Sequence, residues 1–324
     1  MDVLDHGRIV NIFSCELEDW FHILDSDKVP PIEEWDGLTL RVERNTERLL
    51  DLLARTGVRG TFFCLGWIAE RAPQLVRRCR DAGHEIGSHG YGHVLAYKVG
   101  RKAFYEDLVR SRKILEDITG EPVAGFRAPG FCVRKDSQWL FDVVVQAGYQ
   151  YDASVFPARH GHGGFLLTPP EPHIIETPDG VLVEVPTTTV RMFNRRVCLF
   201  GGGYLRLSPL PLIRWGIRKV HECGQPLVVY VHPREIDPDH PRLPLGRWRR
   251  FKCYTNLRST MPKLRWLCEN YRFTTMGSVV AGLREEPEPV AVEVAATGTS
   301  MGAAIVATRG RPRPLVPVER VQFR

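Results

Sequence analysis

Two histidines four residues apart, His89 and His93, are the pair in this sequence best suited to metal chemistry. They lie in the stretch G-S-H-G-Y-G-H, where a single turn of the backbone can aim both imidazoles at one point. The glycines let the backbone approach a ligand closely. Two solvated or hydrogen-bonded rings would give the same pattern, so the pair needs other ligands before it indicates a metal.

Polar residues that could join this pair follow apolar runs elsewhere in the chain. They are the acidic cluster Glu16, Glu18 and Asp19, the single residues Arg127 and Asp152, and the lone histidine His232. In a parallel α/β barrel the residues that follow the strands gather on one face, however far apart they are in sequence. Because separate burial of each group would cost several kcal/mol, we expect these groups to converge.

The elements that must position these groups alternate between strand and helix. Apolar runs predict strands at residues 8–14, 60–65, 84–86, 123–126, 149–152, 226–231 and 271–274. Helical spacing predicts helices at residues 41–55, 73–82, 102–119, 138–147, 211–222 and 261–271. Strands and helices in this alternation indicate parallel pairing, as in an α/β barrel or an open doubly wound sheet.

The rhythm breaks between residues 156 and 188, where six prolines interrupt any long element. Asp179-Gly180 before the alternating V-L-V-E-V predicts a hairpin within this insertion. Beyond residue 280 the composition shifts to Glu, Pro, Ala, Gly and Thr without a periodic apolar face. We therefore predict a catalytic domain over residues 1–280 and a disordered C-terminal tail over residues 281–324.

Composition excludes several classes of protein. A chain of 324 residues with 43% apolar content can bury a large core. The net charge of +6 is modest and the charges look interspersed, which argues against a nucleic-acid binder. Eight cysteines without a C-x-x-C pair favour reduced thiols, and no run approaches the ~18 apolar residues of a membrane span. Since the N-terminus also lacks the pattern of a signal peptide, we expect a cytoplasmic protein.

The stretch R-L-P-L-G-R-W-R-R-F-K, from Arg242 to Lys252, concentrates positive charge beside aromatic rings. Such a stretch is usually a solvated face. The alternative is a contact with an anionic glycan or with the pyrophosphate of a lipid carrier, which would bring the protein to a membrane surface.

Residues 10–280 resemble the polysaccharide deacetylases of carbohydrate esterase family 4. Five motifs match in order: Glu18-Asp19, His89 with His93, Arg127-Ala128-Pro129, Asp152 and His232. E-D-W-F-H and V-H-P-R-E-I-D-P are similar to the exosortase-associated (PEP-CTERM) exopolysaccharide branch. That branch normally has Asp where this chain has Glu16, which lengthens the side chain by one methylene. The family implies a distorted (β/α) barrel with seven or eight parallel strands, here with a hairpin-bearing insertion.

The resemblance also implies a site. Asp19, His89 and His93 would hold a divalent metal, zinc first, with cobalt or nickel as alternatives. Glu18 would accept the proton of the attacking water, with Glu16 as the alternative base, so which acid has which role stays open.

For the remaining motifs the family implies the following roles. Arg127 would keep the base ionised, His232 would protonate the leaving amine, and Asp152 would hold the other ring nitrogen of His232.

The implied reaction is removal of N-acetyl groups from N-acetylhexosamine units of a bacterial exopolysaccharide or its precursor. An N-acetylated glycan is thus the expected partner, and nucleic acid and a transmembrane span are not expected. Two other functions remain: hydrolysis of a cyclic amide such as allantoin, and glycan binding by a protein that lost its base at Glu16.

Overall fold

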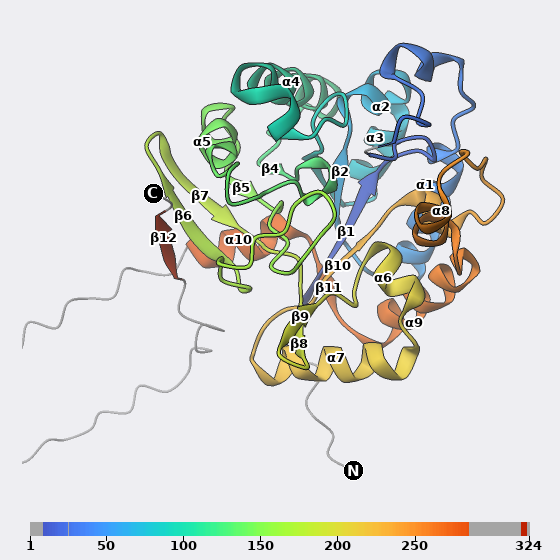
Figure 1. The fold of residues 1–324 in the computed structure, drawn as a ribbon, viewed down its shortest axis with the longest axis vertical. Helices are drawn as coiled ribbons and strands as arrows, with labels where there is room; N and C mark the ends of the chain where they lie inside the picture. Colours follow the sequence, from blue (N-terminus) through green and yellow to red (C-terminus); the bar gives the residue numbers. More distant parts are fainter. Residues whose placement is uncertain (1–8, 25, 285–318, 323–324) are drawn as a thin grey trace, which may run out of the picture.

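The computed structural model describes residues 9–24, 26–284 and 319–322, which form an α/β fold around one large sheet (Figure 1). The strands are β1 (Asn11–Leu17), β2 (Thr61–Cys64), β3 (Glu85–Ser88), β4 (Gly125–Phe126), β5 (Tyr151–Asp152), β6 (His173–Thr177), β7 (Gly180–Glu184), β8 (Val190–Met192), β9 (Arg195–Val197), β10 (Val228–Val231), β11 (Phe273–Thr274) and β12 (Arg320–Gln322). The sheet order is β10-β1-β2-β3-β4-β5-β7-β6-β12, and β11 pairs with β1.

Neighbouring strands are parallel from β10 through to β7, and β11 is parallel to β1. This confirms the predicted α/β class with a mostly parallel sheet. The hydrogen-bonded order of the described strands does not return from β12 to β10, so it shows no closed barrel.

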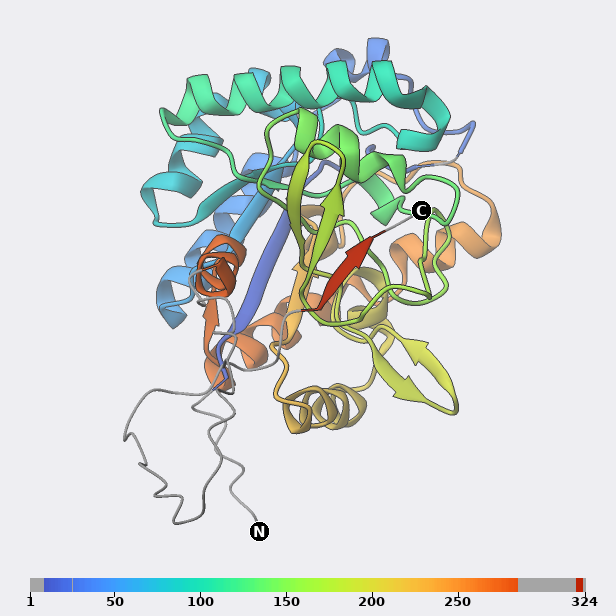
Figure 2. The same ribbon diagram turned by 90° about the vertical axis from the view of Figure 1, so that its left-hand side faces the viewer.

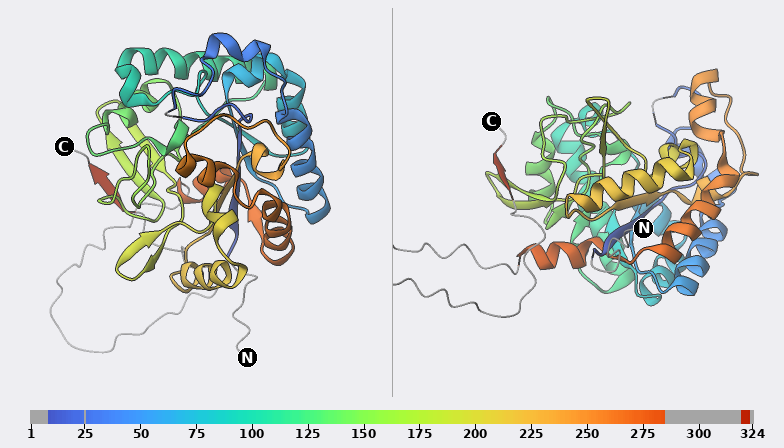
Figure 3. Two further views of the ribbon diagram at one scale, coloured as in Figure 1. Left: turned by 45° about the vertical axis from the view of Figure 1, so that its right-hand side comes forward. Right: turned by 90° about the horizontal axis from the view of Figure 1, so that it is seen from below.

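The helices form an arc around the outer side of the sheet, as the two views in Figure 3 show. They are α1 (Val42–Thr56), α2 (Gly66–Arg71), α3 (Pro73–Asp81), α4 (Ala96–Thr119), α5 (Trp139–Gln146), α6 (Gly202–Leu207), α7 (Leu210–Glu222), α8 (Arg247–Tyr254), α9 (Thr260–Asn270) and α10 (Met276–Arg284). Short 3-10 turns lie at Ile32–Gly37, Pro129–Phe131, Pro233–Ile236 and Leu257–Ser259. The α1 helix ends at Gly57, whose φ of 67° suits glycine best.

Successive side chains of β1 point to opposite faces of the sheet, one covered by helices and the other turned to the interior of the fold. Phe13, Cys15 and Leu17 belong to the apolar core under the helices. Ser14 and Glu16 point the other way, because side chains alternate between the two faces of a strand. The interior face of β1 therefore carries polar groups at its carboxyl end, where the candidate site lies.

The predicted elements are largely confirmed, with shifted boundaries. The first strand begins at Asn11 and continues to Leu17, so Glu16 lies within β1 rather than after it. The prediction missed the helices α2, α6, α8 and α10, the β8–β9 hairpin and β12. The predicted hairpin after residue 178 is present as β6–β7, and β7 joins the main sheet beside β5.

The predicted boundary at residue 280 needs correction. The α10 helix continues to Arg284, and Val280 packs in the interior cluster beside Met276. Arg320–Gln322 form β12, which pairs with β6. The rest of the predicted tail, 285–318 and 323–324, lies outside the described residues. No helix among the described residues combines the length and apolar character needed to cross a bilayer.

Candidate active site

The carboxyl end of β1 brings Glu18 against the two predicted histidines. Glu18 Oε1 lies 2.8 Å from His93 Nε2 and 3.2 Å from His89 Nε2, and all three side chains are buried. These groups come from nearby strands, since β1 pairs with β2 and β2 pairs with β3. The histidine loop, residues 89–93, follows directly after β3. Figure 2 shows β1 as the long blue strand that runs through the interior of the molecule.

The histidine loop is held in an unusual conformation by a residue that the sequence analysis did not single out. His93 has a φ of 54°, a left-handed conformation that is costly for a residue with a Cβ. The Asp107 carboxylate from α4 accepts the backbone N–H groups of Tyr91 (2.7 Å) and Gly92 (2.9 Å). This contact fixes the loop that presents both imidazoles.

The groups around Glu18 fit a divalent metal. His89 Nδ1 lies 2.7 Å from the backbone oxygen of Arg127, so Nδ1 must carry the proton that it donates. When this ring is neutral, the lone pair of its Nε2 faces a Glu18 oxygen, which is also an acceptor. A cation between them removes this repulsion, and an imidazole anchored through its other nitrogen is typical of metal sites. One ligand atom from each of Glu18, His89 and His93 lies within 4.8 Å of the others.

A second group of charges adjoins the first. Glu16 Oε2 lies 2.9 Å from His232 Nε2, and Arg127 donates from Nη1 to Glu16 Oε1 over 3.1 Å. His232 Nδ1 lies 3.1 Å from Oε2 of Glu235, a partner that the sequence analysis missed. The Arg206 guanidinium donates to the other oxygen of Glu235 over 3.0 Å. Glu235 stands three residues after His232 in the H-P-R-E motif, so its spacing could have revealed it.

These ion pairs control the protonation of the site. Burial alone favours the neutral form of each group. For His232 the carboxylates of Glu18, Glu16 and Glu235 outweigh burial and raise its pKa to about 10. For Glu16 the charges of His232 and Arg127 outweigh burial and lower its pKa to about 2. The site without metal thus holds a carboxylate and an imidazolium in contact near neutral pH.

The predicted metal role of Asp19 is corrected by the structure. Its carboxylate accepts backbone N–H groups of Trp20 (2.7 Å), Arg41 (2.7 Å) and Val42 (2.9 Å), and so caps the first turn of α1. Glu18, one residue earlier, points to the histidines instead. The reason is geometric, since adjacent side chains at a strand end point in different directions. Glu18 therefore replaces Asp19 as the candidate metal carboxylate, and Glu16 replaces Glu18 as the candidate base.

Asp152 also differs from its predicted role. It accepts hydrogen bonds from the Ser154 hydroxyl (2.6 Å) and backbone N–H (3.1 Å), and lies opposite Glu184 in the β5–β7 register. The ring nitrogen of His232 that Asp152 was expected to hold is bound by Glu235 instead.

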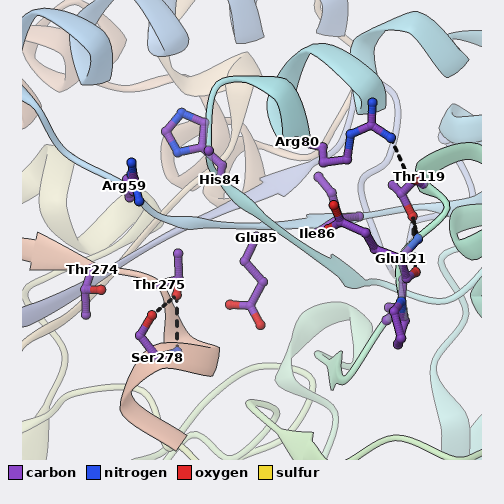
Figure 4. Close-up of a pocket in the computed structure, with 13 residues that line it drawn as sticks. Arg59, Arg80, His84, Glu85, Ile86, Thr119, Glu121, Thr274, Thr275 and Ser278 are labelled. Carbon is purple, nitrogen blue, oxygen red and sulfur yellow. Dashed lines mark hydrogen bonds between the residues drawn. The ribbon is translucent and has the colours of Figure 1, made fainter. Parts of the chain in front are cut away.

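The structure brings Glu16, Glu18, His89, His93, Arg127 and His232 together, as the convergence argument expected. A separate hollow of about 440 Å³ lies at the opposite ends of the strands (Figure 4). Its lining includes Arg59 and His84, which come just before β2 and β3, and Arg80, which donates to the Thr119 carbonyl. These residues belong to the wrong end of the sheet to join the site.

Fold and site together define an α/β protein whose buried carboxylate–histidine cluster can hold a divalent metal. Residues 34–151 match the family model described as polysaccharide deacetylase, and residues 153–281 match a domain of unknown function, DUF3473. Over 105 residues, 32% of this chain, the sequence is 33% identical to a peptidoglycan-N-acetylglucosamine deacetylase of Bacillus cereus and covers 47% of it. Over 108 residues, 33% of this chain, it is 30% identical to a peptidoglycan deacetylase of Helicobacter pylori and covers 36% of it.

The chain thus matches a polysaccharide deacetylase domain over residues 34–151. It spans less than half the length of these two curated relatives. Two crystal structures named as polysaccharide deacetylases share the fold. One, from Mycobacterium smegmatis, has a TM-score of 0.58 at 19% identity, covering 88% of this chain and 93% of the other. The second, from Pseudomonas aeruginosa PAO1, has a TM-score of 0.53 at 18% identity, covering 88% and 94%.

Proposed function

We propose that this protein is a metal-dependent N-deacetylase that acts on N-acetylhexosamine units of a bacterial exopolysaccharide or its precursor. The observation that carries the proposal is the convergence of Glu18, His89 and His93 beside the Glu16–His232 pair. One half of this arrangement can bind a cation and the other can exchange protons with a substrate. Hydrolysis of an amide needs both.

Glu18, His89 and His93 would hold the metal, and zinc suits two imidazoles and one carboxylate. When bound, a divalent ion polarises the acetamide carbonyl and lowers the pKa of a coordinated water.

The remaining chemistry belongs to the side chains of the chain itself. Glu16 accepts a proton from the attacking water, and Arg127 holds its carboxylate in place. His232 donates a proton to the nitrogen as the carbon–nitrogen bond breaks, which releases acetate and a free amine. Glu235 keeps the His232 ring oriented through Nδ1. Although Glu16 is one methylene longer than the expected Asp, its contacts with Arg127 and His232 support a catalytic role over a degenerate one.

All eight cysteines are free thiols, which supports a location in a reducing compartment such as the cytoplasm.

The test combines metal content with acetate release from N-acetylglucosamine oligomers. Wild-type protein should contain about one metal ion per chain, lose activity in a chelator and regain it with zinc or cobalt. Glu16→Gln should keep the metal but lose about 10²–10⁴-fold in rate, because it removes only the base. Fully loaded protein that releases no acetate from any N-acetylated sugar would refute the proposal.

A further inference from the structure

The positive charge of this chain is segregated, contrary to the expectation of interspersed charges. Residues 185–221 contain seven Lys and Arg and no Asp or Glu, and residues 240–268 contain eight and again no Asp or Glu. Because the whole chain carries +6, the rest must carry −9. The first acid-free stretch contains the β8–β9 hairpin and the second contains α8.

The α8 helix exposes aromatic rings among these charges. Trp248 is 69% exposed and Phe251 43% exposed. Their rings are stacked with centroids 5.6 Å apart, and Lys252 Nζ lies 5.4 Å from the Trp248 ring centre. Arg247 and Arg250 are exposed on the same helix. Helices that combine Trp or Phe with Lys and Arg in this way are typical of membrane surfaces.

The tip of the β8–β9 hairpin repeats this combination. Phe193 is 91% exposed and has a φ of 47°, and Asn194 beside it has a φ of 59°. The left-handed conformation is strained for phenylalanine, and the exposed ring gains nothing from the core. Arg191 and Arg195 flank the tip and are exposed. An apolar tip flanked by arginines that contributes nothing to folding points to a contact outside the molecule.

The two features lie on one side of the molecule. In Figure 2 the orange α8 and the yellow-green β8–β9 hairpin both lie on the right-hand side, although Figure 1 shows them apart from each other within that side. Arg206, which holds Glu235, also donates to the backbone oxygens of Lys252 (2.8 Å) and Thr255 (2.8 Å) at the end of α8. Arg206 therefore links the end of α8 to Glu235, which contacts the His232 ring. We call Arg191, Phe193, Arg195, Arg247, Trp248, Arg250, Phe251 and Lys252 the basic-aromatic face.

We infer that the basic-aromatic face docks on an anionic lipid bilayer. Arginine and lysine are attracted to anionic headgroups, and exposed aromatic rings insert at the level of the interface. A nucleic acid would use the same charges, but its bases would need open ring faces on which to stack. Stacking on a sugar needs a bare ring face, and Trp248 is already stacked on Phe251 and covered by Lys252. Binding of this kind goes beyond the proposed deacetylation and does not depend on it.

The experiment is co-sedimentation of the whole protein with vesicles. Wild-type protein should bind vesicles of phosphatidylcholine with phosphatidylglycerol, and not vesicles of phosphatidylcholine alone. Arg247→Gln/Arg250→Gln should lower the partition coefficient about 30-fold, since each cation near the surface contributes a factor of about five. Phe193→Ser and Trp248→Ser/Phe251→Ser should each lower it at least about tenfold.

Matched controls come from α4, which also carries exposed apolar and basic side chains. Tyr105→Ser/Val109→Ser removes apolar side chains that are 39% and 38% exposed, and Lys102→Gln/Lys113→Gln removes two exposed positive charges. Both controls should bind vesicles as the wild type does, and thermal unfolding will show that every variant is folded. The inference is overturned if wild-type protein ignores anionic vesicles, or if the α4 variants lose as much binding as those of the basic-aromatic face. It is also overturned if single-stranded nucleic acid binds more tightly than the vesicles and loses nothing in the aromatic variants.

Discussion

The acids Glu16 and Glu235 can be compared with the pair Asp152 and Glu184, because all four carboxyl groups are buried in the same fold. The pKa of Glu16 and that of Glu235 are both lowered to about 2. The pKa of Asp152 is raised, and that of Glu184 is raised well above its usual value. Burial acts in the same direction on all four, so it cannot be the cause of the difference.

The charges of the neighbouring side chains cause this difference in pKa. Glu235 lies against the cations Arg206 and His232, which favour its ionised form. Glu184 lies against Asp152, and the donor that reaches it is the backbone N–H of Val155. Glu184 Oε2 has no hydrogen-bond partner among the described residues. The neighbouring cations therefore keep Glu16 and Glu235 ionised, whereas the neighbouring carboxyl groups of Asp152 and Glu184 favour a bound proton.

Glu18 is expected to show the largest effect, because it belongs to the charged region and contacts both histidines. Glu18→Gln should remove the bound metal and lower the rate of deacetylation at least about a thousandfold. Metal analysis and acetate release measure the two effects. Glu184→Gln is the control and should keep both, and a Glu18→Gln protein that still binds metal tightly would contradict the assignment.

The comparison predicts that replacing Glu by Gln lowers the free energy of unfolding by different amounts at two buried positions. Glu235→Gln leaves the buried Arg206 without its carboxylate and should lower the free energy of unfolding by about 3–5 kcal/mol. Glu184→Gln replaces a protonated acid with a neutral amide and should change it by no more than about 1 kcal/mol. Urea unfolding at pH 5 measures both, because there the proton on Glu184 costs little and Glu235 is still ionised. Equal losses would show that burial matters more than the partner.

The same comparison predicts opposite pH dependence in protein stripped of metal. Glu235 has a folded pKa of about 2 against an ordinary 4.5, so its stabilisation is present above pH 4.5 and is lost as the pH falls toward 2. Glu184 has a raised pKa, so its contribution is present below pH 4.5 and is lost as the pH rises. The stability gap between wild type and Glu235→Gln should therefore shrink from pH 5 to pH 3.

Relative to Glu184→Gln, the wild type should instead lose stability from pH 5 to pH 8. Unfolding at a series of pH values with chelator present follows both gaps. Two gaps that change in the same direction would contradict the comparison.

Asp19 is expected to show the smallest effect. Asp19→Asn keeps an oxygen for the N–H groups at the start of α1 but removes the negative charge near the helix dipole. It should cost about 1 kcal/mol of unfolding free energy and leave the metal content unchanged. Loss of metal in this variant would restore Asp19 as a ligand.

Much of the fold was predictable because the signals are local. The leucines of α1 and the stop at Gly57 follow helical periodicity, and apolar runs predicted the strands of the sheet. The β8–β9 hairpin was missed because its turn, Phe193-Asn194, lacks the glycine that usually announces a left-handed turn.

The sequence by itself determined which polar groups follow the strands, and therefore that Glu18, His89, His93 and His232 would meet at one end of a parallel sheet. Only the tertiary structure decided their roles. Asp19 turned to the start of α1, Glu18 to the histidines, and Glu235 took the place expected of Asp152. The physical reason is that residue order determines which groups reach the end of the sheet, whereas the direction of each side chain depends on donors and charges supplied by distant segments.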